Sequence, residues 1–218
     1  MAEFKPGDSV RIKEEVMSPD IEGQCIGGWQ GRVLEVIRDF DGEVTVIIEL
    51  DSETLREMSP FYIYECRLSF MDCLIIELPS ENIEPAVSRD TEEDTMMAAG
   101  DVKLIMELLL NGDSLAPTEF YQVWTDYLTR ILIFPFKAKV SKCQVEHHFQ
   151  QGDSVNVRAI DSVDERYGLI AEVWDGRDKF YFPLCSLEVA DKESPDYVPV
   201  EDYRTWFADY CESEPDDS

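Results

Sequence analysis

Alternating hydrophobic and polar positions dominate residues 7–85 and predict a small β-rich module. The segment VTVIIEL at 44–50 is rich in β-branched side chains, which favour strands. Residues 51–68 break the alternation with apolar positions at helical spacing, behind a suitable N-cap at Asp51 or Ser52. The apolar face of this helix would consist of Leu55, Met58, Tyr62 and Cys66. Short strands with polar turns and glycine at the bends are typical of a small SH3-like barrel.

Helical spacing of apolar residues governs the middle of the chain and returns near its end. Residues 101–113 begin with Asp and end with Asn-Gly-Asp, which favours a helix with a natural stop. A second helix follows with Pro117 in its first turn. Its expected packing face consists of Phe120, Trp124, Tyr127 and Leu128. A last helix, expected to pack on the second β-module, has on one face Tyr203, Trp206, Phe207 and Tyr210.

The tetrapeptide GDSV occurs twice, at 7–10 and at 152–155. Each copy is followed by the pattern Gly-x-hydrophobic-x-Glu-Val-hydrophobic, which starts at Gly31 and at Gly168, and then by a turn and an apolar run. These matches predict a divergent internal repeat in which GDSV opens the first strand of each copy. The alternative is that Gly-Asp is an ordinary turn ahead of any alternating strand.

These patterns predict a mainly β protein with helices, built from two small SH3-like barrels joined by a helical linker. The C-terminal helix packs on the second barrel. The expected boundaries are 1–86 for the N-terminal module, 87–116 for an acidic and helical linker, 117–211 for the second barrel with its leading and trailing helices, and 212–218 for an acidic tail.

The charge of the chain is strongly negative, with 47 acidic against 19 basic residues and a formal net charge of -28. Such a chain repels polyanions, so we expect no nucleic-acid partner and no binding to anionic membranes, whereas cations gather around it. No apolar run is long enough to span a membrane, and no signal-peptide pattern is present. The six cysteines include no CxxC pair and mostly have apolar neighbours. We therefore expect reduced, mostly buried thiols in a cytoplasmic protein.

Catalytic chemistry is not indicated by the residues. His147 and His148 are adjacent, so in an extended segment they point to opposite faces. With Cys143 nearby they still lack a fourth zinc ligand. No P-loop and no set of nucleophile, base and orienting partner can be assembled. We expect a protein without enzymatic activity.

Two acidic turns in the second half are candidates for binding a divalent cation. One contains Asp161, Asp164 and Glu165, and the other contains Asp175 and Asp178. Calcium takes six to eight oxygen ligands, and EF-hand spacing is absent, so a site would have to combine turns that are distant in sequence. In a compact barrel we expect these two turns to lie at the same end. Further ligands behind them would be Asp196 and Glu201.

Solvated loops in a very acidic protein remain the alternative to a calcium site. The equivalent turn in the first half contains Asp39, Asp41 and Glu43. It is the weaker candidate, because Asp and Gly are ordinary turn residues and Asp39 is expected to serve the turn.

Several segments of the second half together resemble the small acidic calcium-binding proteins of cyanobacteria, the CcbP family. They are WTDYLTRILIFPFKAKV at 124–140, GDSVNVRAI at 152–160, ERYGLIAEVWDGRDKFYFPLCSLEV at 165–189 and VEDYRTWFADY at 200–210. The resemblance implies an SH3-like barrel with a leading helix and with Ca²⁺ bound by surface acids. The first half lacks these signatures. The function predicted is calcium binding as a buffer or sensor.

A protein-interaction module is the main alternative function. SH3-like barrels often bind peptides through exposed aromatic residues between loops, and Trp29 lies between glycines in such a segment. The competing interpretation of Trp29 is that it covers the barrel core. A further alternative is an acidic decoy that occupies a basic partner.

Overall fold

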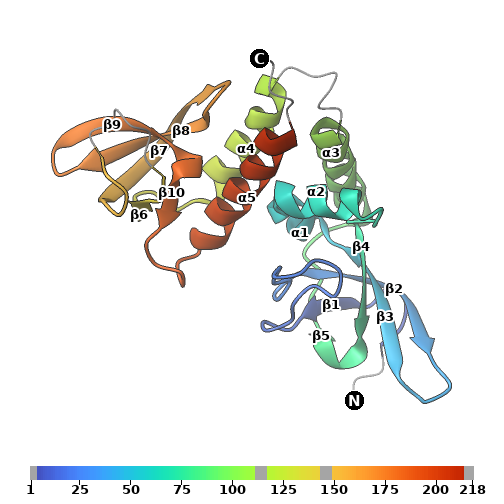
Figure 1. Cartoon of the computed structure of the whole chain (residues 1–218). Helices are drawn as coiled ribbons and strands as arrows, with labels where there is room; N and C mark the ends of the chain where they lie inside the picture. The colour runs from blue at the N-terminus through green and yellow to red at the C-terminus, as the bar shows by residue number, and fades with distance from the viewer. Residues whose placement is uncertain (1–3, 111–116, 143–148, 214–218) are drawn as a thin grey trace. The chain divides into compact units, whose positions relative to one another are not determined.

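The computed structural model describes residues 4–110, 117–142 and 149–213. The chain divides into two compact units, residues 1–110 and 111–218 (Figure 1). Within the described residues, each unit contains one five-stranded antiparallel sheet, and the two units together contain five α-helices. The fold is therefore mixed, with more helix than a mainly β prediction implies. None of the described helices is long and apolar enough to cross a membrane.

The sheet of the first unit has the strand order β4-β3-β2-β1-β5. Its strands are β1 (Ser9–Ile12), β2 (Gln30–Arg38), β3 (Val44–Leu50), β4 (Ile75–Pro79) and β5 (Ile83–Pro85). A short 3₁₀ helix at Ser80–Asn82 connects β4 to β5. The pairing of β2 with β3 shifts between Val33 and Glu35, where a β-bulge bends the hairpin.

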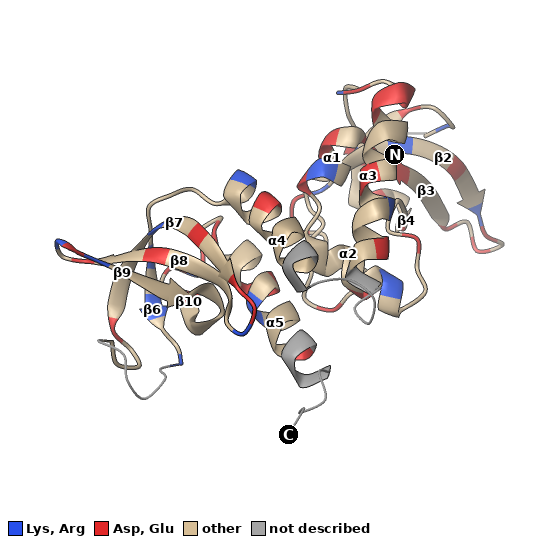
Figure 2. Cartoon of the chain, turned by 90° about the horizontal axis from the view of Figure 1, so that it is seen from above, with Lys and Arg blue, Asp and Glu red and all other residues tan. Residues whose placement is uncertain are grey.

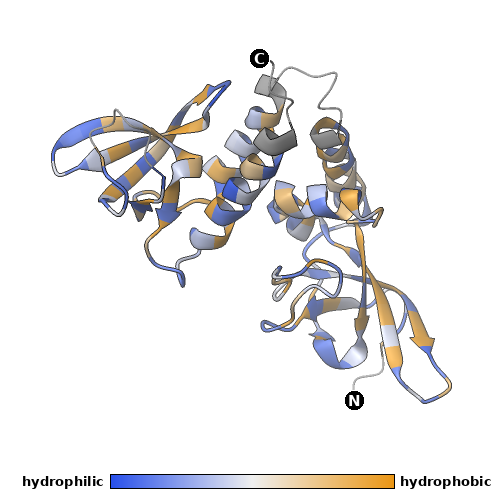
Figure 3. Ribbon diagram, viewed as in Figure 1, coloured by the Kyte–Doolittle hydropathy of each residue, from blue (hydrophilic) through white to orange (hydrophobic). Residues whose placement is uncertain are grey.

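The sheet of the second unit has the order β10-β6-β7-β8-β9. Its strands are β6 (Phe136–Val140), β7 (Ser154–Asp164), β8 (Gly168–Asp175), β9 (Asp178–Pro183) and β10 (Leu187–Val189). A 3₁₀ helix at Leu184–Ser186 again precedes the last strand. Counted along each unit, both sheets have the order 5-1-2-3-4. Hydrophobic and hydrophilic residues alternate along the strands of both sheets (Figure 3).

The two GDSV copies do not occupy equivalent strands. The first leads into β1, the first strand of its sheet, but the second leads into β7, the second strand of its sheet. The expectation that GDSV opens the first strand of each copy is therefore wrong for the second copy. The tetrapeptide recurs because it forms the same turn twice: Gly7 and Gly152 have φ of 91° and 94°. What repeats between the units is the strand order.

Neither sheet closes into a barrel within the described residues, since the edge strands β4 and β5, or β9 and β10, do not pair with each other. The two predicted SH3-like barrels are thus, in the described residues, two open five-stranded antiparallel sheets. In each unit, helices of that unit lie beside the sheet (Figure 1).

Three helices belong to the first unit: α1 (Ser52–Glu57), α2 (Pro60–Leu68) and α3 (Glu92–Leu110). Asp51 caps α1, because its Oδ1 accepts a hydrogen bond from Thr54 N at 2.9 Å. The single helix expected over 51–68 is split in two, because Pro60 lacks an N–H and starts a new helix at its preferred first position. The predicted apolar face is confirmed, with four buried side chains: Leu55, Met58, Tyr62 and Cys66.

Helix α3 lies in the range that we predicted as linker. It contacts both α1 and α2, and its Ala98 and Val102 are buried. The segment therefore contributes to the core of the first unit.

The second unit has helices α4 (Pro117–Ile131) and α5 (Tyr197–Ser213). The predicted packing face of α4 is confirmed, since four side chains are buried: Phe120, Trp124, Tyr127 and Leu128. Helix α5 packs on the sheet as predicted, because the Tyr203 hydroxyl accepts a hydrogen bond from Leu169 N at 2.8 Å. Trp206 is buried beside it, and the side chain of Tyr210 lies outside the described residues.

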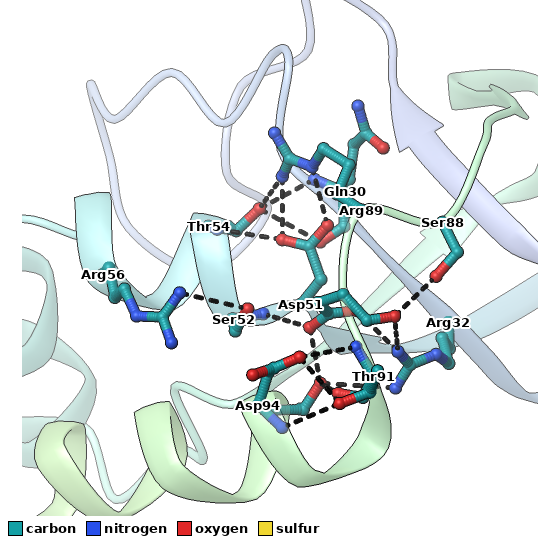
Figure 4. A network of polar contacts seen from close by, with 12 residues as sticks. Gln30, Arg32, Asp51, Ser52, Thr54, Arg56, Ser88, Arg89, Thr91 and Asp94 are labelled. Atoms are coloured by element: carbon teal, nitrogen blue, oxygen red, sulfur yellow. Dashed lines mark hydrogen bonds and ion pairs between the residues drawn. The ribbon is translucent and has the colours of Figure 1, made fainter.

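A network of hydrogen bonds and ion pairs connects residues 88–95 to the sheet and to α1 of the first unit (Figure 4). Asp90 Oδ1 pairs with Arg32 Nη2 at 2.5 Å. Its Oδ2 accepts hydrogen bonds from Ser52 N and Thr95 Oγ1, both at 2.7 Å. Partial burial raises the pKa of Asp90, but these hydrogen bonds and the charge of Arg32 outweigh burial, so the pKa lies below its ordinary value.

We expect Asp90→Asn to lower the melting temperature of the first unit at pH 7, and the effect to become smaller as pH falls below about 3.9. An unfolded aspartate has a pKa of about 3.9. Because the folded-state pKa is lower, the carboxylate stabilises the fold above that value, and the stabilisation is lost as pH falls through the folded-state pKa. The measurement is the difference in melting temperature between the variant and the native chain from pH 7 to pH 3. A difference that stays constant across this range would contradict the prediction.

Candidate functional site

The first acidic turn joins β7 to β8. Asp161 is exposed near the end of β7. Asp164 closes the turn, because its Oδ1 accepts hydrogen bonds from Arg166 N and Tyr167 N, both at 2.9 Å. Glu165 is exposed at the turn, and its carbonyl oxygen lies 3.5 Å from the hydroxyl of Tyr121 on α4. The turn therefore presents carboxylates to solvent, and its backbone is held by the two hydrogen bonds to Asp164.

The second acidic turn joins β8 to β9. Asp175 and Asp178 face each other as the last pair of the hairpin, and both are exposed. The two-residue turn between them contains Gly176 at φ 59°, a conformation that glycine adopts without strain. Like charges directly opposite each other on a hairpin repel. A divalent cation between them would relieve this repulsion.

The two acidic turns lie at opposite ends of β8. This strand has eight residues, which corresponds to about 23 Å at the usual rise per residue. Ligands of one calcium ion lie only about 2.3–2.6 Å from it. The expectation that both turns lie at one end of a barrel is therefore wrong, because consecutive hairpins of an antiparallel sheet turn at alternate ends.

Asp196 and Glu201 hold α5 in place. Asp196 is only 4% exposed, and its two oxygens accept hydrogen bonds from Ile133 N at 2.7 Å and Ser194 Oγ at 3.0 Å. Glu201 pairs with Arg204 at 2.5 Å, and Arg204 Nε donates to the carbonyl of Cys185 at 3.3 Å. Asp196 therefore connects the start of α5 to Ile133, whereas Glu201 pairs within α5 with Arg204, which in turn contacts Cys185.

In the part of the chain that the structure describes, no three His, Cys, Asp or Glu side chains gather in an arrangement that could hold a metal ion. Cys143, His147 and His148 lie outside that part. Acidic residues are spread over many elements of both units (Figure 2). The five candidate carboxylates of the two turns thus form two separate groups, one of three and one of two. With one oxygen from each carboxylate, neither group reaches the six to eight oxygens that calcium takes.

In the first unit, the side chain of Asp39 closes the acidic turn between β2 and β3. Asp39 Oδ1 accepts hydrogen bonds from Asp41 N at 3.0 Å and from Glu43 N at 2.8 Å. The prediction that Asp39 serves the turn is confirmed. Trp29 is half-buried and meets Tyr62 edge to face, with ring centroids 4.9 Å apart, which favours a packing role for Trp29.

The described cysteines are less uniformly buried than expected. Cys66 and Cys73 are buried, Cys185 is half-buried and Cys25 is exposed, and all four are unlinked. Burial raises the pKa of the Cys66 and Cys73 thiols to about 12. These two side chains therefore stay protonated at neutral pH, as packed structural cysteines do.

Sequence reasoning missed an ion-paired surface on β7, β8 and β9. Arg158 lies over the ring of Trp174, 4.2 Å from its centroid, and Trp174 Nε1 donates to Glu172 at 2.7 Å. Glu172 also pairs with Lys179 at 2.6 Å. The hydrogen bonds from Lys179 and Trp174 lower the pKa of Glu172. The signal in the sequence was the alternation that places these side chains on one face of the sheet.

Comparison with known proteins shows a family similarity for the second half of the chain. Residues 103–207 match the model of the CcbP family, which is described as calcium binding. No curated protein matches the chain. The crystal structure of CcbP from Anabaena is 26% identical, with a TM-score of 0.37, over 44% of this chain and 80% of that one.

A second solved structure, a calcium binding protein in the calcium-binding form, is 23% identical, with a TM-score of 0.36, over 45% of this chain and 82% of that one. The resemblance predicted from the sequence is confirmed by the family model. Residues 103–207 of this chain match the CcbP family, whose description is calcium binding.

Proposed function

We propose that the second unit binds Ca²⁺ through surface carboxylates and acts as a calcium buffer or sensor without catalysis. The observation that carries this proposal is the family match over residues 103–207. The net charge of -28 supports it, because such a field raises the local concentration of divalent cations. The shared 5-1-2-3-4 strand order supports assigning both units to the SH3-like class.

We assign the ligands to two separate positions, because about 23 Å of β8 lies between the two acidic turns. One position uses Asp161, Asp164 and Glu165, and the other uses Asp175 and Asp178. Each provides two or three carboxylates, so backbone carbonyls and water would supply the remaining oxygens. Such open, partly hydrated sites bind calcium with dissociation constants on the order of 10⁻⁶ to 10⁻⁴ M. In this proposal Asp196 and Glu201 position α5 and do not bind the ion.

The proposal is tested by calcium calorimetry on chelator-stripped protein, in about 0.15 M salt to screen diffuse attraction and with magnesium present. We expect a saturable isotherm. Two isosteric variants separate the positions: Asp161→Asn/Asp164→Asn and Asp175→Asn/Asp178→Asn. Asparagine keeps the turn hydrogen bonds of Asp164, so each change removes charge while the backbone stays in place.

The matched control is Asp39→Asn/Asp41→Asn, which makes the same charge change in a hairpin turn of the first unit. We expect each second-unit variant to lose the heat of its own position and the control to retain full stoichiometry. Saturable binding that persists in both second-unit variants would support calcium binding but contradict the assignment of these residues as ligands. No saturable heat, together with a melting temperature indifferent to calcium, would contradict the proposal and favour a protein-interaction module.

A further inference from the structure

Phe70 combines an unfavourable backbone conformation with an exposed aromatic ring. It follows the last turn of α2 with φ 57°, the left-handed region that is an outlier for a bulky side chain. Glycine ordinarily occupies this position after a helix. The ring is 88% exposed, so packing within the described residues does not offset the unfavourable conformation. Such outliers cluster at ligand-binding sites.

Phe70 borders a surface hollow of about 350 Å³ between the end of α2 and α3 of the first unit. This volume is in the range of small-ligand sites. The walls are mainly apolar, with two cationic side chains and one carboxylate at the border. The lining residues are Arg67, Phe70, Met71, Asp72, Leu74, Lys103 and Met106.

The two cations at the hollow are unusual in a chain with 47 acidic and 19 basic residues. Neither Arg67 nor Lys103 makes an ion pair with a carboxylate in the described part of the chain, whereas Arg32 and Arg89 do. Asp72 uses its Oδ1 to accept a hydrogen bond from Leu74 N at 3.0 Å, which fixes the turn below the hollow. The hollow therefore offers positive charge beside apolar surface.

We propose that this hollow binds a small amphipathic carboxylate. The apolar body of the ligand lies against Phe70, Leu74 and Met106, and its acid group lies at Arg67 and Lys103. A ligand with one negative charge fits better than a polyanion, because the net charge of the protein repels each added charge at long range. An apolar ligand would cover the exposed Phe70 ring and remove its apolar surface from water. This gain gives a reason for an exposed aromatic side chain in a disfavoured backbone conformation.

Sodium decanoate is the probe, and decyltrimethylammonium of the same chain length is the charge control. Both are titrated into the full chain with EDTA present, which prevents calcium soaps and separates this test from calcium binding. We expect saturable amide shifts in two-dimensional NMR, confined to residues 66–75 and 102–107, with decanoate only. The net negative charge of the protein favours the cationic amphiphile, so a preference for decanoate would have to come from local positive charge at the hollow. Equal binding of the cationic amphiphile, or shifts elsewhere, would overturn the proposal.

Two variants test the named side chains. Arg67→Gln/Lys103→Gln should weaken decanoate binding at least tenfold, whereas Lys5→Gln/Arg38→Gln, the same charge change elsewhere in the first unit, should not. Phe70→Gly should weaken binding several-fold and raise the melting temperature by about 2–4 °C, because glycine adopts positive φ without strain. Unchanged binding in either test variant, or a Phe70→Gly chain that melts at a lower temperature, would overturn the proposal.

Discussion

Gly168→Ala is expected to destabilise the second unit by about 4 kcal/mol. A Cβ atom at Gly168 would lie 2.3 Å from the Tyr203 hydroxyl and 2.6 Å from the ring of Phe207. Overpacking of this kind costs about 1–3 kcal/mol, and the φ of 67° adds about 1 kcal/mol for a residue with a side chain. Moving Tyr203 would also break its hydrogen bond to Leu169 N, worth about 1 kcal/mol.

Gly176→Ala is the matched control for this prediction. Gly176 has a similar φ of 59°, but nothing lies within 4 Å of the position of its Cβ. We therefore expect only the backbone cost of about 1 kcal/mol. Hydrogen exchange of β7–β9 amides reports on the second unit alone, and tryptophan fluorescence adds a probe of Trp124 and Trp206. Equal destabilisation by the two alanines would contradict the prediction. It would mean that α5 moves away from the added methyl group at Gly168 at little energetic cost.

Asp51→Ala is expected to destabilise the first unit by about 3 kcal/mol. The Asp51 side chain is 5% exposed and receives two hydrogen bonds from Arg89, at 2.8 and 2.9 Å, and one from Thr54 N. Removing one member of a buried ion pair costs about 3–5 kcal/mol, and losing an N-cap costs about 1 kcal/mol. Arg89 is 28% exposed, so water partly replaces the lost carboxylate. The expected destabilisation is therefore smaller than the sum of these two costs.

Glu53→Ala is the control, because Glu53 pairs with the same arginine at 3.2 Å but is 46% exposed. An exposed pair contributes less than about 1 kcal/mol. Asp51→Asn separates the two roles, since asparagine can cap α1 but cannot carry the charge. Hydrogen exchange of α1 and β2 amides measures each effect. If Glu53→Ala were as damaging as Asp51→Ala, burial would not be the source of the stabilisation.

Local features of this protein were predictable because they depend on residues only a few positions apart. Asp51 caps α1 through Thr54, and Asp39 closes its own hairpin turn. The aromatic face of α4 followed from a spacing of three and four residues. Where the prediction of one helix over 51–68 failed, the cause was also local, because Pro60 starts a second helix.

The candidate calcium site was only partly predictable. The acidic turns could be recognised as turns, and the family resemblance was recognisable from four segments of the second half. The turns were wrongly expected to share one end of a barrel, because a list of strands does not state where consecutive hairpins turn. Asp196 was predicted as a further calcium ligand, but it is buried and accepts a hydrogen bond from Ile133 N, a partner 63 residues away in the chain.

The sequence by itself determined the character of each segment: where alternation makes strands, where helical spacing makes helices, which residues cap them, and a net charge that favours cations. The tertiary structure decided what those segments face. It placed the second GDSV on β7, joined Arg32 to Asp90 across 58 residues and put Phe70 beside two cations. The physical reason is that periodicity and capping are properties of neighbours along the chain, whereas strand order and burial depend on which distant segments pack together.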